Sequence, residues 1–513
     1  MRKWVALALV LMLALAAALP LPAESSAQEG IFTSLWQLNG KRIGVQVGTD
    51  YELLVEKLLP EAEISFYNSY PDLAAALETN KIDGFPGDEP VLKFMAAEDS
   101  QLAVLPEDMD PVEMACVLPR SESGRKLAEE LNAWIVSAKE SGEMDEIAYK
   151  WIEGPESEKT IPDYASFPAP KGTLRMVTEG AYTPMNYFRG TELVGFEIDM
   201  AARFCEAGGY GLIIEVMNFD AIVPAIQAGK ADFAAASFII EEERQESVVF
   251  SEPYIQCGTM MAVLKGAQGE SESLSFWEGI RSSFNKTFLR EDRWILFVNG
   301  ILNTLLITAL SMLFGTALGF GLFMMCRKGN RFANAVTGFA TWLIKGMPMV
   351  VLLMILYYVV FGNVAISGLM VSVVGFSLTF GASVFGLLQM GVGAVDKGQY
   401  EAAYALGHSD RRTFYKIIHP QALPHILPQY KGEVVSLIQS TAIVGYIAVQ
   451  DLTKMGDIVR SRTYEAFFPL IAVTIIYFLL EGLLGFLISR INVSIDPKKR
   501  SRERILKGVK IHD

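Results

Sequence analysis

The sequence is short of several features that would define an enzyme or a nucleic-acid-binding protein. None of its 513 residues form a GxxxxGK[ST] phosphate loop, so the chain is not expected to hydrolyse ATP itself. Its four cysteines lack metal-ligand spacing; we interpret them as structural, and a Cys205–Cys257 pair is the alternative. The net charge is −14 and there is no basic stripe, which argues against nucleic acid. We therefore predict no catalytic site, metal or cofactor.

What the sequence does contain divides into an acidic first half and an apolar second half. Hydrophobic residues make up 51% of the chain, which fits a soluble part joined to a membrane part. Arg2 and Lys3 precede an apolar run, residues 4–19, and Ser25 and Ala27 suit the positions that flank a cleavage site. Residues 1–28 are thus predicted to be a secretory signal peptide, with an uncleaved anchor as the alternative.

The first half alternates apolar strands with amphipathic helices in two blocks, which predicts α/β architecture. Residues 29–154 form the first block, which ends in a long helical stretch from Gly124 to about Trp151. The second block covers residues 172–266. Between them, residues 155–171 contain four prolines and are expected to be a linker.

The second half contains five apolar runs that are long enough to suggest membrane spans. A flexible segment and an amphipathic, aromatic-rich stretch come first, in residues 267–294, and the latter is expected to lie on the outer membrane surface or to fold onto the first half. The predicted membrane domain is 295–492, with a basic tail at 493–513. The expected spans are residues 295–325, 347–361, 369–392, 433–448 and 467–488.

Basic residues predict the orientation of these spans, because they gather on the cytoplasmic side. Lysines and arginines follow the first, third and fifth spans, so these ends are expected to be cytoplasmic and the first half exported. The loop from Asp451 to Glu465 is a local exception: it contains Lys454, Arg460 and Arg462 yet should face outward. Gly315 and Gly319, four residues apart in the first span, predict close helix packing.

A polar segment between the third and fourth spans, EAAYALGHSDRRTFYKIIHP (residues 401–420), predicts two short helices. Gly407 suits a left-handed turn after the first helix, and Ser409 or Asp410 can cap the second, which Pro420 is expected to end. We call residues 401–420 the docking segment, because such a compact unit between membrane spans can bind a soluble partner.

The docking segment resembles the cytoplasmic "EAA loop" of ATP-binding-cassette (ABC) importer permeases. The matching positions are Glu401, Ala402, Ala403, Gly407, Ile417 and Pro420; His419 stands where leucine is usual. KGMPMVVLLMILYY (residues 345–358) and VDKGQYEAAYALG (residues 395–407) resemble the polar-amino-acid permeases. This resemblance implies a separate cytoplasmic ATPase subunit and a second permease copy, which we expect to form a homodimer.

The two α/β blocks resemble the lobes of type II, amino-acid-binding periplasmic proteins. In residues 172–266, TEGAYTPMNY and FDAIVPAIQAGKADF resemble the family's first lobe; in residues 29–154, LNGKRIGVQVGTDYE and IDGFPGDEPVLKF resemble its second lobe. The order is reversed relative to that family. We therefore predict a circularly permuted binding domain, fused to an all-α membrane domain; a fragment of a tandem pair is the rival interpretation.

The same resemblance assigns ligand-binding roles to seven residues. Arg244 would bind the ligand carboxylate and Asp88 its ammonium, which suits the fork of arginine and the charge of aspartate. Tyr182 and Phe219 would sandwich the side chain, with core packing as the alternative for each. The remaining three are Gly48 and Thr49, which would contact the carboxylate, and Glu179 near the pocket mouth.

Several positions depart from these families. Ile239 and Glu241 replace hydroxyl residues, and Ser237 stands where glycine is common. In the membrane half, Gly386, Gln389 and Gln439 replace charged residues, which suggests a less charged translocation pathway.

The predicted function is the substrate-binding and permease subunit of an ABC importer for amino acids, with polar amino acids as the expected ligands. The location would be the bacterial inner membrane, multi-pass, with the binding domain outside the cytoplasm. A ligand-gated ion channel with an amino-acid-binding domain is the alternative, but it would need a pore loop with a carbonyl filter that the sequence does not display. A chemosensory receptor is a third hypothesis.

Overall fold

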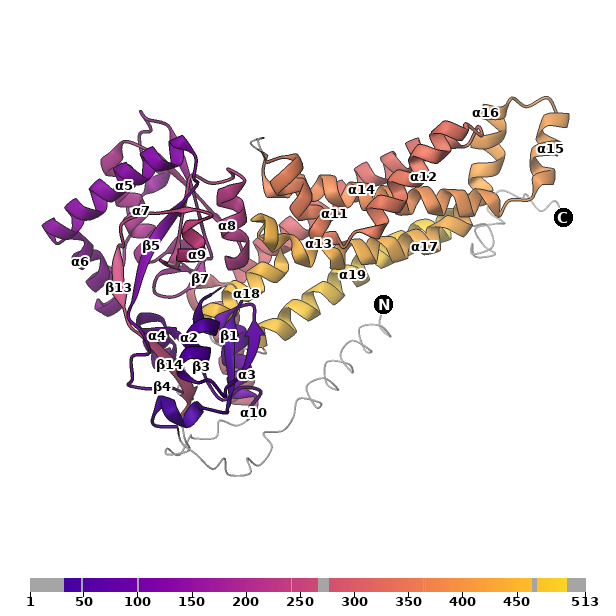
Figure 1. Cartoon of the computed structure of the whole chain (residues 1–513). Helices are drawn as coiled ribbons and strands as arrows, with labels where there is room; N and C mark the ends of the chain where they lie inside the picture. The colour runs from indigo at the N-terminus through magenta and orange to yellow at the C-terminus, as the bar shows by residue number, and fades with distance from the viewer. Residues whose placement is uncertain are drawn as a thin grey trace.

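The computed structural model describes residues 32–47, 49–98, 101–240, 242–265, 276–362, 364, 366–463 and 468–495. It contains a two-lobed α/β half, residues 32–265, and a helical half, residues 276–495 (Figure 1). The predicted signal peptide (1–28), residues 267–275, Gly48, Glu241 and the tail beyond residue 495 lie outside the described residues.

Lobe two comprises residues 32–110 together with one later strand. Parallel strands β1 and β2 join β3 through a bridge between Ile43 and Gly84, and β14 pairs antiparallel with β3 and β4. Helices cover this sheet, and the apolar residues on their inner faces, such as Val55 and Leu73, are fully buried. The elements are η1 (Leu35–Leu38), β1 (Arg42–Gln46), α2 (Tyr51–Leu58), β2 (Glu63–Tyr67), α3 (Tyr70–Glu78), β3 (Phe85–Asp88), α4 (Glu89–Glu98), β4 (Leu102–Val104) and β14 (Thr259–Leu264).

Lobe one comprises residues 112–257. Its main sheet has the strand order β10-β6-β11-β5-β12, with β13 also paired to β5, and a small β7-β8-β9 sheet lies beside it. The strands are β5 (Val112–Leu118), β6 (Thr173–Thr178), β7 (Ala181–Tyr182), β8 (Asn186–Arg189), β9 (Glu192–Val194), β10 (Gly211–Val216), β11 (Phe233–Ile239), β12 (Val249–Phe250) and β13 (Ile255–Cys257). The helices are α5 (Glu122–Ser141), α6 (Glu143–Ala148), η2 (Tyr149–Glu153), α7 (Phe196–Gly208), α8 (Phe219–Gln227) and α9 (Glu242–Gln245).

The chain crosses between the lobes twice, so the lobes are not two consecutive blocks. β5 comes from the first predicted block yet pairs with β11 of the second, and β14 returns to lobe two. The two crossing segments bind each other: Met109 N donates to Thr259 O at 2.7 Å, and Thr259 N donates to Asp110 O at 3.2 Å. This hydrogen-bonded pair is the hinge between the lobes.

The predicted linker, residues 155–171, packs along lobe one and contains two short 3-10 turns, η3 (Glu156–Glu158) and η4 (Tyr164–Ser166). Ile161, Tyr164 and Phe167 lie partly buried against the core. Arg189 donates a hydrogen bond to Lys159 O at 2.6 Å. The segment is therefore an ordered strap over lobe one.

The helical half contains three helices that are long and apolar enough to cross a membrane, or up to five spans if each of two bent pairs counts as one. The bent pairs are residues 331–360, with a 109° bend, and residues 410–463, with a 58° bend. The elements are α10 (Phe276–Phe284), η5 (Asn285–Leu289), η6 (Arg290–Asp292), α11 (Trp294–Cys326), α12 (Arg331–Gly346), α13 (Met349–Met354), η7 (Ile355–Val360), α14 (Gly368–Gly393), α15 (Lys397–Ala405), α16 (Asp410–Thr413), η8 (Phe414–Ile418), α17 (His419–Ser440), η9 (Thr441–Ile447), α18 (Leu452–Thr463) and α19 (Phe468–Ile495).

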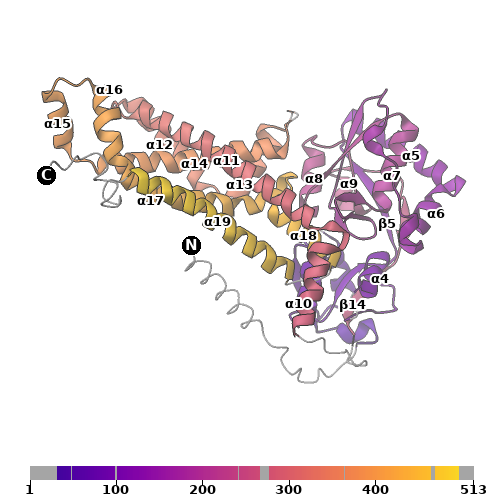
Figure 2. The ribbon, with the colours of Figure 1, turned by 180° about the vertical axis from the view of Figure 1, so that it is seen from behind.

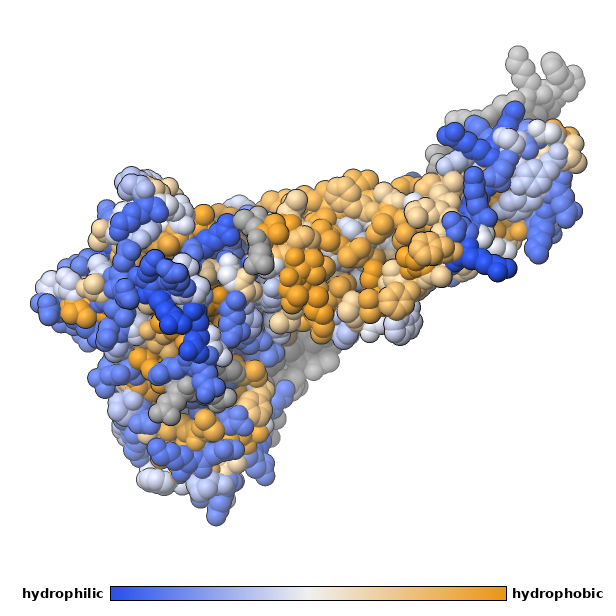
Figure 3. All heavy atoms as spheres, turned by 45° about the horizontal axis from the view of Figure 1, so that its top comes forward, coloured by the Kyte–Doolittle hydropathy of each residue, from blue (hydrophilic) through white to orange (hydrophobic). Residues whose placement is uncertain are grey.

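Surface hydropathy follows this division. Hydrophobic residues cover the middle of the helical half, while both the two-lobed half and the opposite end, with the docking segment, are hydrophilic (Figure 3). The predicted first, third and fifth spans coincide with α11, α14 and α19. The predicted second span covers the second arm of the first bent pair, and the predicted fourth span covers the last part of the first arm of the second pair.

Pro420 does not end a helix, which corrects the sequence prediction. Helical structure continues from Asp410 to Ile447, and Pro420 falls in the first turn of α17. This turn directly follows the π-helical segment η8, a place where a helix can accommodate a proline, and Pro424 and Pro428 lie further along α17 without ending it. Gly407 does adopt the expected left-handed turn, with φ +76°, and Ser409 caps α16 by accepting from Arg412 N at 3.4 Å.

The predicted close packing at Gly315 and Gly319 is confirmed. A Cβ at Gly319 would lie 2.6 Å from the carbonyl oxygen of Gly381, and one at Gly315 would lie 3.0 Å from that of Ser377. Glycine thus lets α11 and α14 approach with their backbones nearly in contact.

Seen from behind, α10 leads from the lobe that holds β14 toward α11 and α18 (Figure 2).

Candidate ligand-binding site

A cavity of about 360 Å³ lies between the two lobes. That volume includes open solvent; only about 20 Å³ of it can hold the centre of a water-sized sphere, so the closed cleft has little empty space. Six of the seven predicted site residues line it; Gly48 lies outside the described residues. The lining residues are Gln46, Thr49, Asp50, Tyr51, Tyr70, Asp88, Glu179, Tyr182, Phe219, Ala236, Ser237, Ile239 and Arg244.

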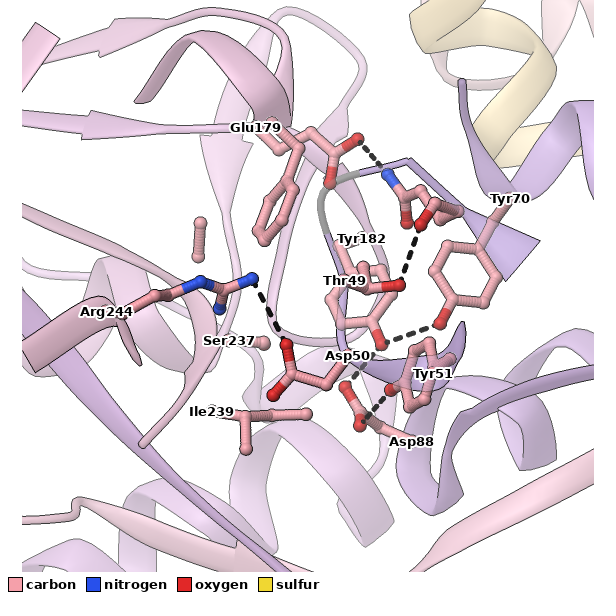
Figure 4. Close-up of a pocket in the computed structure, with 13 residues that line it drawn as sticks. Thr49, Asp50, Tyr51, Tyr70, Asp88, Glu179, Tyr182, Ser237, Ile239 and Arg244 are labelled. Carbon is pink, nitrogen blue, oxygen red and sulfur yellow. Dashed lines mark hydrogen bonds and ion pairs between the residues drawn. The ribbon is translucent and has the colours of Figure 1, made fainter. Parts of the chain in front are cut away.

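Asp88 ends β3 on the lobe-two side of the cavity and is 2% exposed. Its carboxylate accepts hydrogen bonds from Tyr51 Oη, at 2.6 Å, and from Tyr182 Oη, which belongs to lobe one (Figure 4). Burial raises the pKa of Asp88 to about 6, although both tyrosine hydrogen bonds oppose that rise. In its ionised form, the Asp88 carboxylate can bind a cationic group of a ligand.

Glu179 follows β6 on the lobe-one side of the cavity and is 8% exposed. Its Oε1 accepts from Gln46 Nε2 of lobe two at 3.3 Å. Burial raises the pKa of Glu179 to about 7, and the strongest opposing influence is the charge of Lys454 on α18. A residue of the helical half thus acts electrostatically on this cavity.

Arg244 belongs to α9, and its Nη2 lies 3.4 Å from Asp50 Oδ1 across the cleft (Figure 4). Its guanidinium also lies over the ring of Phe238, 5.8 Å from the centroid. Tyr182 Oη of lobe one also forms a hydrogen bond with Tyr70 Oη of lobe two at 3.4 Å, so among the described lining residues four polar contacts join the lobes across the cavity. The cleft is therefore closed in this structure.

The two predicted aromatic residues line the cavity but also pack on neighbouring rings. Phe219 stacks on Phe238 with centroids 5.0 Å apart, and Tyr182 lies 5.1 Å from Tyr70. Both proposed roles, ligand contact and core packing, are compatible with these positions.

Ser237 has a left-handed backbone, with φ +52°, which explains why glycine would suit this position. The buried Glu197 carboxylate holds the turn: its Oε1 accepts from Ser237 N at 2.6 Å and from Ser237 Oγ at 3.1 Å. Tyr254 and Asn186 also donate to Glu197. Glu197 thus positions one wall of the cavity.

Helix α18 contacts both lobes beside the cleft. Lys454 Nζ donates to Asn218 Oδ1 of lobe one at 2.9 Å, and Arg460 Nη2 donates to Asp72 Oδ1 of lobe two at 2.8 Å. The guanidinium of Arg462 lies 5.6 Å from the ring centroid of Phe94 and donates to Glu291. The three basic residues that seemed misplaced in an outward loop are thus buried against acidic, amide and aromatic partners.

More contacts fix lobe one to the helical half. Lys230 Nζ donates to the carbonyl oxygens of Phe361 and Val364, and Tyr358 Oη donates to Ala221 O at 3.3 Å. No sequence pattern indicated these pairs or the roles of Tyr51, Tyr70 and Gln46. Only the charge anomaly at residues 454–462 marked α18 as unusual.

At the opposite end of the helical half, the docking segment comprises the last part of α15, α16, η8 and the start of α17 (Figure 1). Ala403 is buried, whereas Tyr404 is 48% and Leu406 77% exposed. Asp410 accepts from Arg327 at 2.7 Å and from Tyr404 Oη at 3.2 Å, which ties the segment to the end of α11. The segment therefore has a fixed base and an apolar, exposed tip.

Residues 174–402 match the family model of bacterial extracellular solute-binding proteins, family 3. The chain is 34% identical over 196 residues to a glutamine transport system permease protein, GlnP, of Rickettsia bellii, covering 38% of this chain and 90% of that protein. The chain belongs to the family of ABC amino-acid transport permeases. In it, the permease is fused to a solute-binding domain.

The chain is also similar to other transport proteins. The arginine transport system permease protein ArtQ of Bacillus subtilis is 32% identical over 211 residues, covering 40% of this chain and 93% of that protein. A crystal structure of an amino acid ABC transporter with histidines is 28% identical and covers 43% of this chain and 98% of that chain, with a TM-score of 0.37. None of these findings supports the ligand-gated channel.

The four cysteines are free, so the Cys205–Cys257 pair is absent.

Proposed function

We propose that this permease captures a polar amino acid between its two lobes and passes it through its helical half, driven by ATP hydrolysis in a separate subunit. One observation carries this proposal: α18 contacts Asp72 of lobe two and Asn218 of lobe one beside a closed cleft. Because α18 contacts both lobes at once, it should bind them most tightly when the cleft between them is closed. Ligand-driven closure is thereby coupled to docking on the membrane helices.

We infer from two features that ATP is hydrolysed in a separate subunit. The sequence contains no GxxxxGK[ST] loop, and the docking segment presents Tyr404 and Leu406 at the end remote from the lobes. An exposed apolar tip with a charged rim suits the groove of a soluble protein. The ATPase relatives of such permeases bind at this type of segment, by the resemblance described above.

The second permease copy is inferred from an open groove between α12, α14 and α17. Polar side chains line it within the hydrophobic band: Thr379, Ser383, Glu433, Ser436 and Ser440. Polar groups facing lipid are costly, so a second copy that covers the groove would complete a translocation path. We propose a homodimer with one such groove from each copy.

We also propose that the chain crosses the bacterial inner membrane five times, with the signal peptide removed and the lobes outside. The binding domain would be circularly permuted: the chain runs from lobe two to lobe one and back, and the family match begins at residue 174, in β6, after the strap. The strap at residues 155–171 would be the segment that joins the former ends.

Cysteine labelling tests this arrangement. Leu53 and Leu406 are 66% and 77% exposed, one on lobe two and one on the docking segment. With Cys257→Ser as background, Leu53→Cys should react with a membrane-impermeant maleimide from outside intact cells, and Leu406→Cys only after permeabilisation. Labelling of both from one side would refute the proposal.

A further inference from the structure

The cavity between the lobes has an excess of acidic side chains. Among its described lining residues, the carboxylates are those of Asp50, Asp88 and Glu179, whereas Arg244 supplies the single guanidinium or ammonium group. Asp88 and Glu179 are nearly fully buried, at 2% and 8% exposure. The side chains of the other two are 24% and 18% exposed.

The one lining cation already faces one of the acids. Arg244 pairs with Asp50 at 3.4 Å, so this pair is close to neutral as a unit. Asp88 accepts from the hydroxyls of Tyr51 and Tyr182, which are uncharged donors. Asp88 therefore has no cationic partner among the described residues, and its ionised form is costly unless a cation from elsewhere pairs with it.

The charge of Glu179 is only partly compensated. Its hydrogen-bond donor among the lining residues is the neutral amide of Gln46, at 3.3 Å. Lys454 lies close enough to influence it, but its ammonium donates to Asn218, outside the cavity lining. The pKa of Glu179 stays raised, at about 7, despite that lysine. Glu179 and Asp88 lie at opposite ends of the group of side chains in Figure 4.

We infer that the cavity takes a ligand with two cationic groups, one bound at Asp88 and one at Glu179. This inference rests on the proposed function and specifies its substrate class. Arg244 can still contact a ligand carboxylate, which would displace or share it with Asp50, so a basic amino acid fits all four charged groups. A diamine fits the two acids but leaves Arg244 to Asp50.

The experiment is equilibrium binding to the full chain in detergent, by isothermal titration calorimetry at pH 8. L-Lysine, L-arginine and L-ornithine are compared with cadaverine, L-glutamine and L-glutamate. We expect the basic amino acids to bind roughly 10- to 100-fold more tightly than glutamine, the range for one extra charge-assisted hydrogen bond. Glutamate should bind most weakly, because it adds a third negative charge next to the buried acids.

Two variants test whether Glu179 causes the preference for basic amino acids. Glu179→Gln keeps the shape of the side chain but removes its charge, so the ratio of lysine to glutamine affinity should fall at least about 10-fold. Glu122→Gln removes a carboxylate that is 86% exposed on α5 and should leave this ratio unchanged. An unchanged ratio in Glu179→Gln would overturn the inference.

The remaining outcomes are also distinct. If glutamine or glutamate binds the wild-type chain as tightly as lysine, the inference is wrong while the proposed function stands with a different ligand. If cadaverine binds as tightly as lysine, the two-cation inference holds and the ligand class is diamines. If none of the compounds binds, both the inference and the proposed amino-acid function fail.

Discussion

Arg460 and Asp72 join two parts of the chain that lie 388 residues apart. The guanidinium of Arg460 on α18 donates to the carboxylate of Asp72 on α3 at 2.8 Å, and Arg460 is only 8% exposed. The contact fastens lobe two to the permease, while Lys454 fastens lobe one through Asn218. One short helix therefore bridges the cleft in which the ligand would lie.

Reversing the charge at either end of this ion pair should release lobe two from α18. Arg460→Asp or Asp72→Arg is expected to weaken docking by roughly 1.5–3 kcal/mol, the value of a hydrogen bond between charged groups. The double variant Arg460→Asp with Asp72→Arg should regain part of the lost docking free energy. Spin labels on lobe two and α18, measured by pulsed electron resonance, report the distance between them.

A matched control is Lys126→Glu in the exposed Lys126–Glu122 pair of lobe one, where the side chains are 69% and 86% exposed. Surface pairs of this kind contribute little, so its distance distribution should match wild type. If the Arg460 and Asp72 variants also match wild type, the ion pair does not hold the lobe.

Arg244→Lys should weaken binding of a carboxylate-bearing ligand by about 10- to 100-fold, because lysine keeps the charge but loses the fork geometry. Asp88→Asn should weaken binding of the ligand ammonium by at least as much. Calorimetric titration measures both. The melting temperature of ligand-free Asp88→Asn should change little, since asparagine spares the fold a buried charge; a large drop would instead mark Asp88 as a structural residue.

Ligand affinity should decrease as the pH falls. In the ligand-free site the pKa of Glu179 is raised to about 7 and that of Asp88 to about 6, both chiefly by burial. Below those values each carboxyl holds a proton that a ligand cation must displace, which costs up to about one decade of affinity per pH unit and group. Lys454 opposes the rise at Glu179, while Asp220 and Glu197 add to it.

Titrations between pH 5.5 and 8.5 check this pH dependence, which should level off above about pH 8. Glu179→Gln should remove the component near pH 7 and leave the one near pH 6. Because the ligand-free fold binds more protons than the unfolded chain between about pH 4 and 7, these two groups should also make it less stable as the pH rises through that interval. A flat affinity profile would show that neither carboxyl binds the ligand as an anion.

Leu406→Asp should abolish recruitment of the ATPase while leaving ligand affinity within about 2-fold, because Leu406 is 77% exposed at the tip of the docking segment, far from the cleft. Leu53→Asp, at a leucine 66% exposed on lobe two, is the matched control. Co-purification of the ATPase with each variant measures the effect. Equal recruitment by both variants would place the motor elsewhere.

Gly407→Ala should destabilise the docking segment by about 1 kcal/mol, since Gly407 has φ +76° and alanine is strained there. No heavy atom lies within 4 Å of an added Cβ, so the cost comes from the backbone alone. Gly407→Asn should cost less, because asparagine tolerates this conformation. Hydrogen exchange at residues 401–410 distinguishes the two; equal protection would contradict this explanation.

The local patterns predicted much of the fold. Long apolar runs located α11, α14 and α19, because spans of that length have few alternatives. The left-handed turn at Gly407 was predicted correctly, because glycine adopts positive φ without strain. Pro420 was misjudged because a proline need not end a helix: it lies in the first turn of α17, and Pro424 and Pro428 lie in the interior of the same helix. Strands of two or three residues, such as β7 and β12, were missed because they are too short to display a period.

The site was predictable only in part. The resemblance placed Arg244, Asp88 and Glu179 around one cavity, but it said nothing of Asp50 facing Arg244 or of the tyrosine hydroxyls on Asp88. Contacts such as Lys454 with Asn218, 236 residues apart, depend on how two folded halves meet. No local pattern records that geometry.

The central claim is that a solute captured in the cleft leaves through the same chain's membrane helices. Uptake of the labelled ligand by cells that produce the permease with its ATPase tests it most directly. We predict that uptake falls to background in both Arg244→Ala and Leu406→Asp, although only the first loses ligand binding. Uptake that persists in Arg244→Ala, at the wild-type rate, would contradict the account.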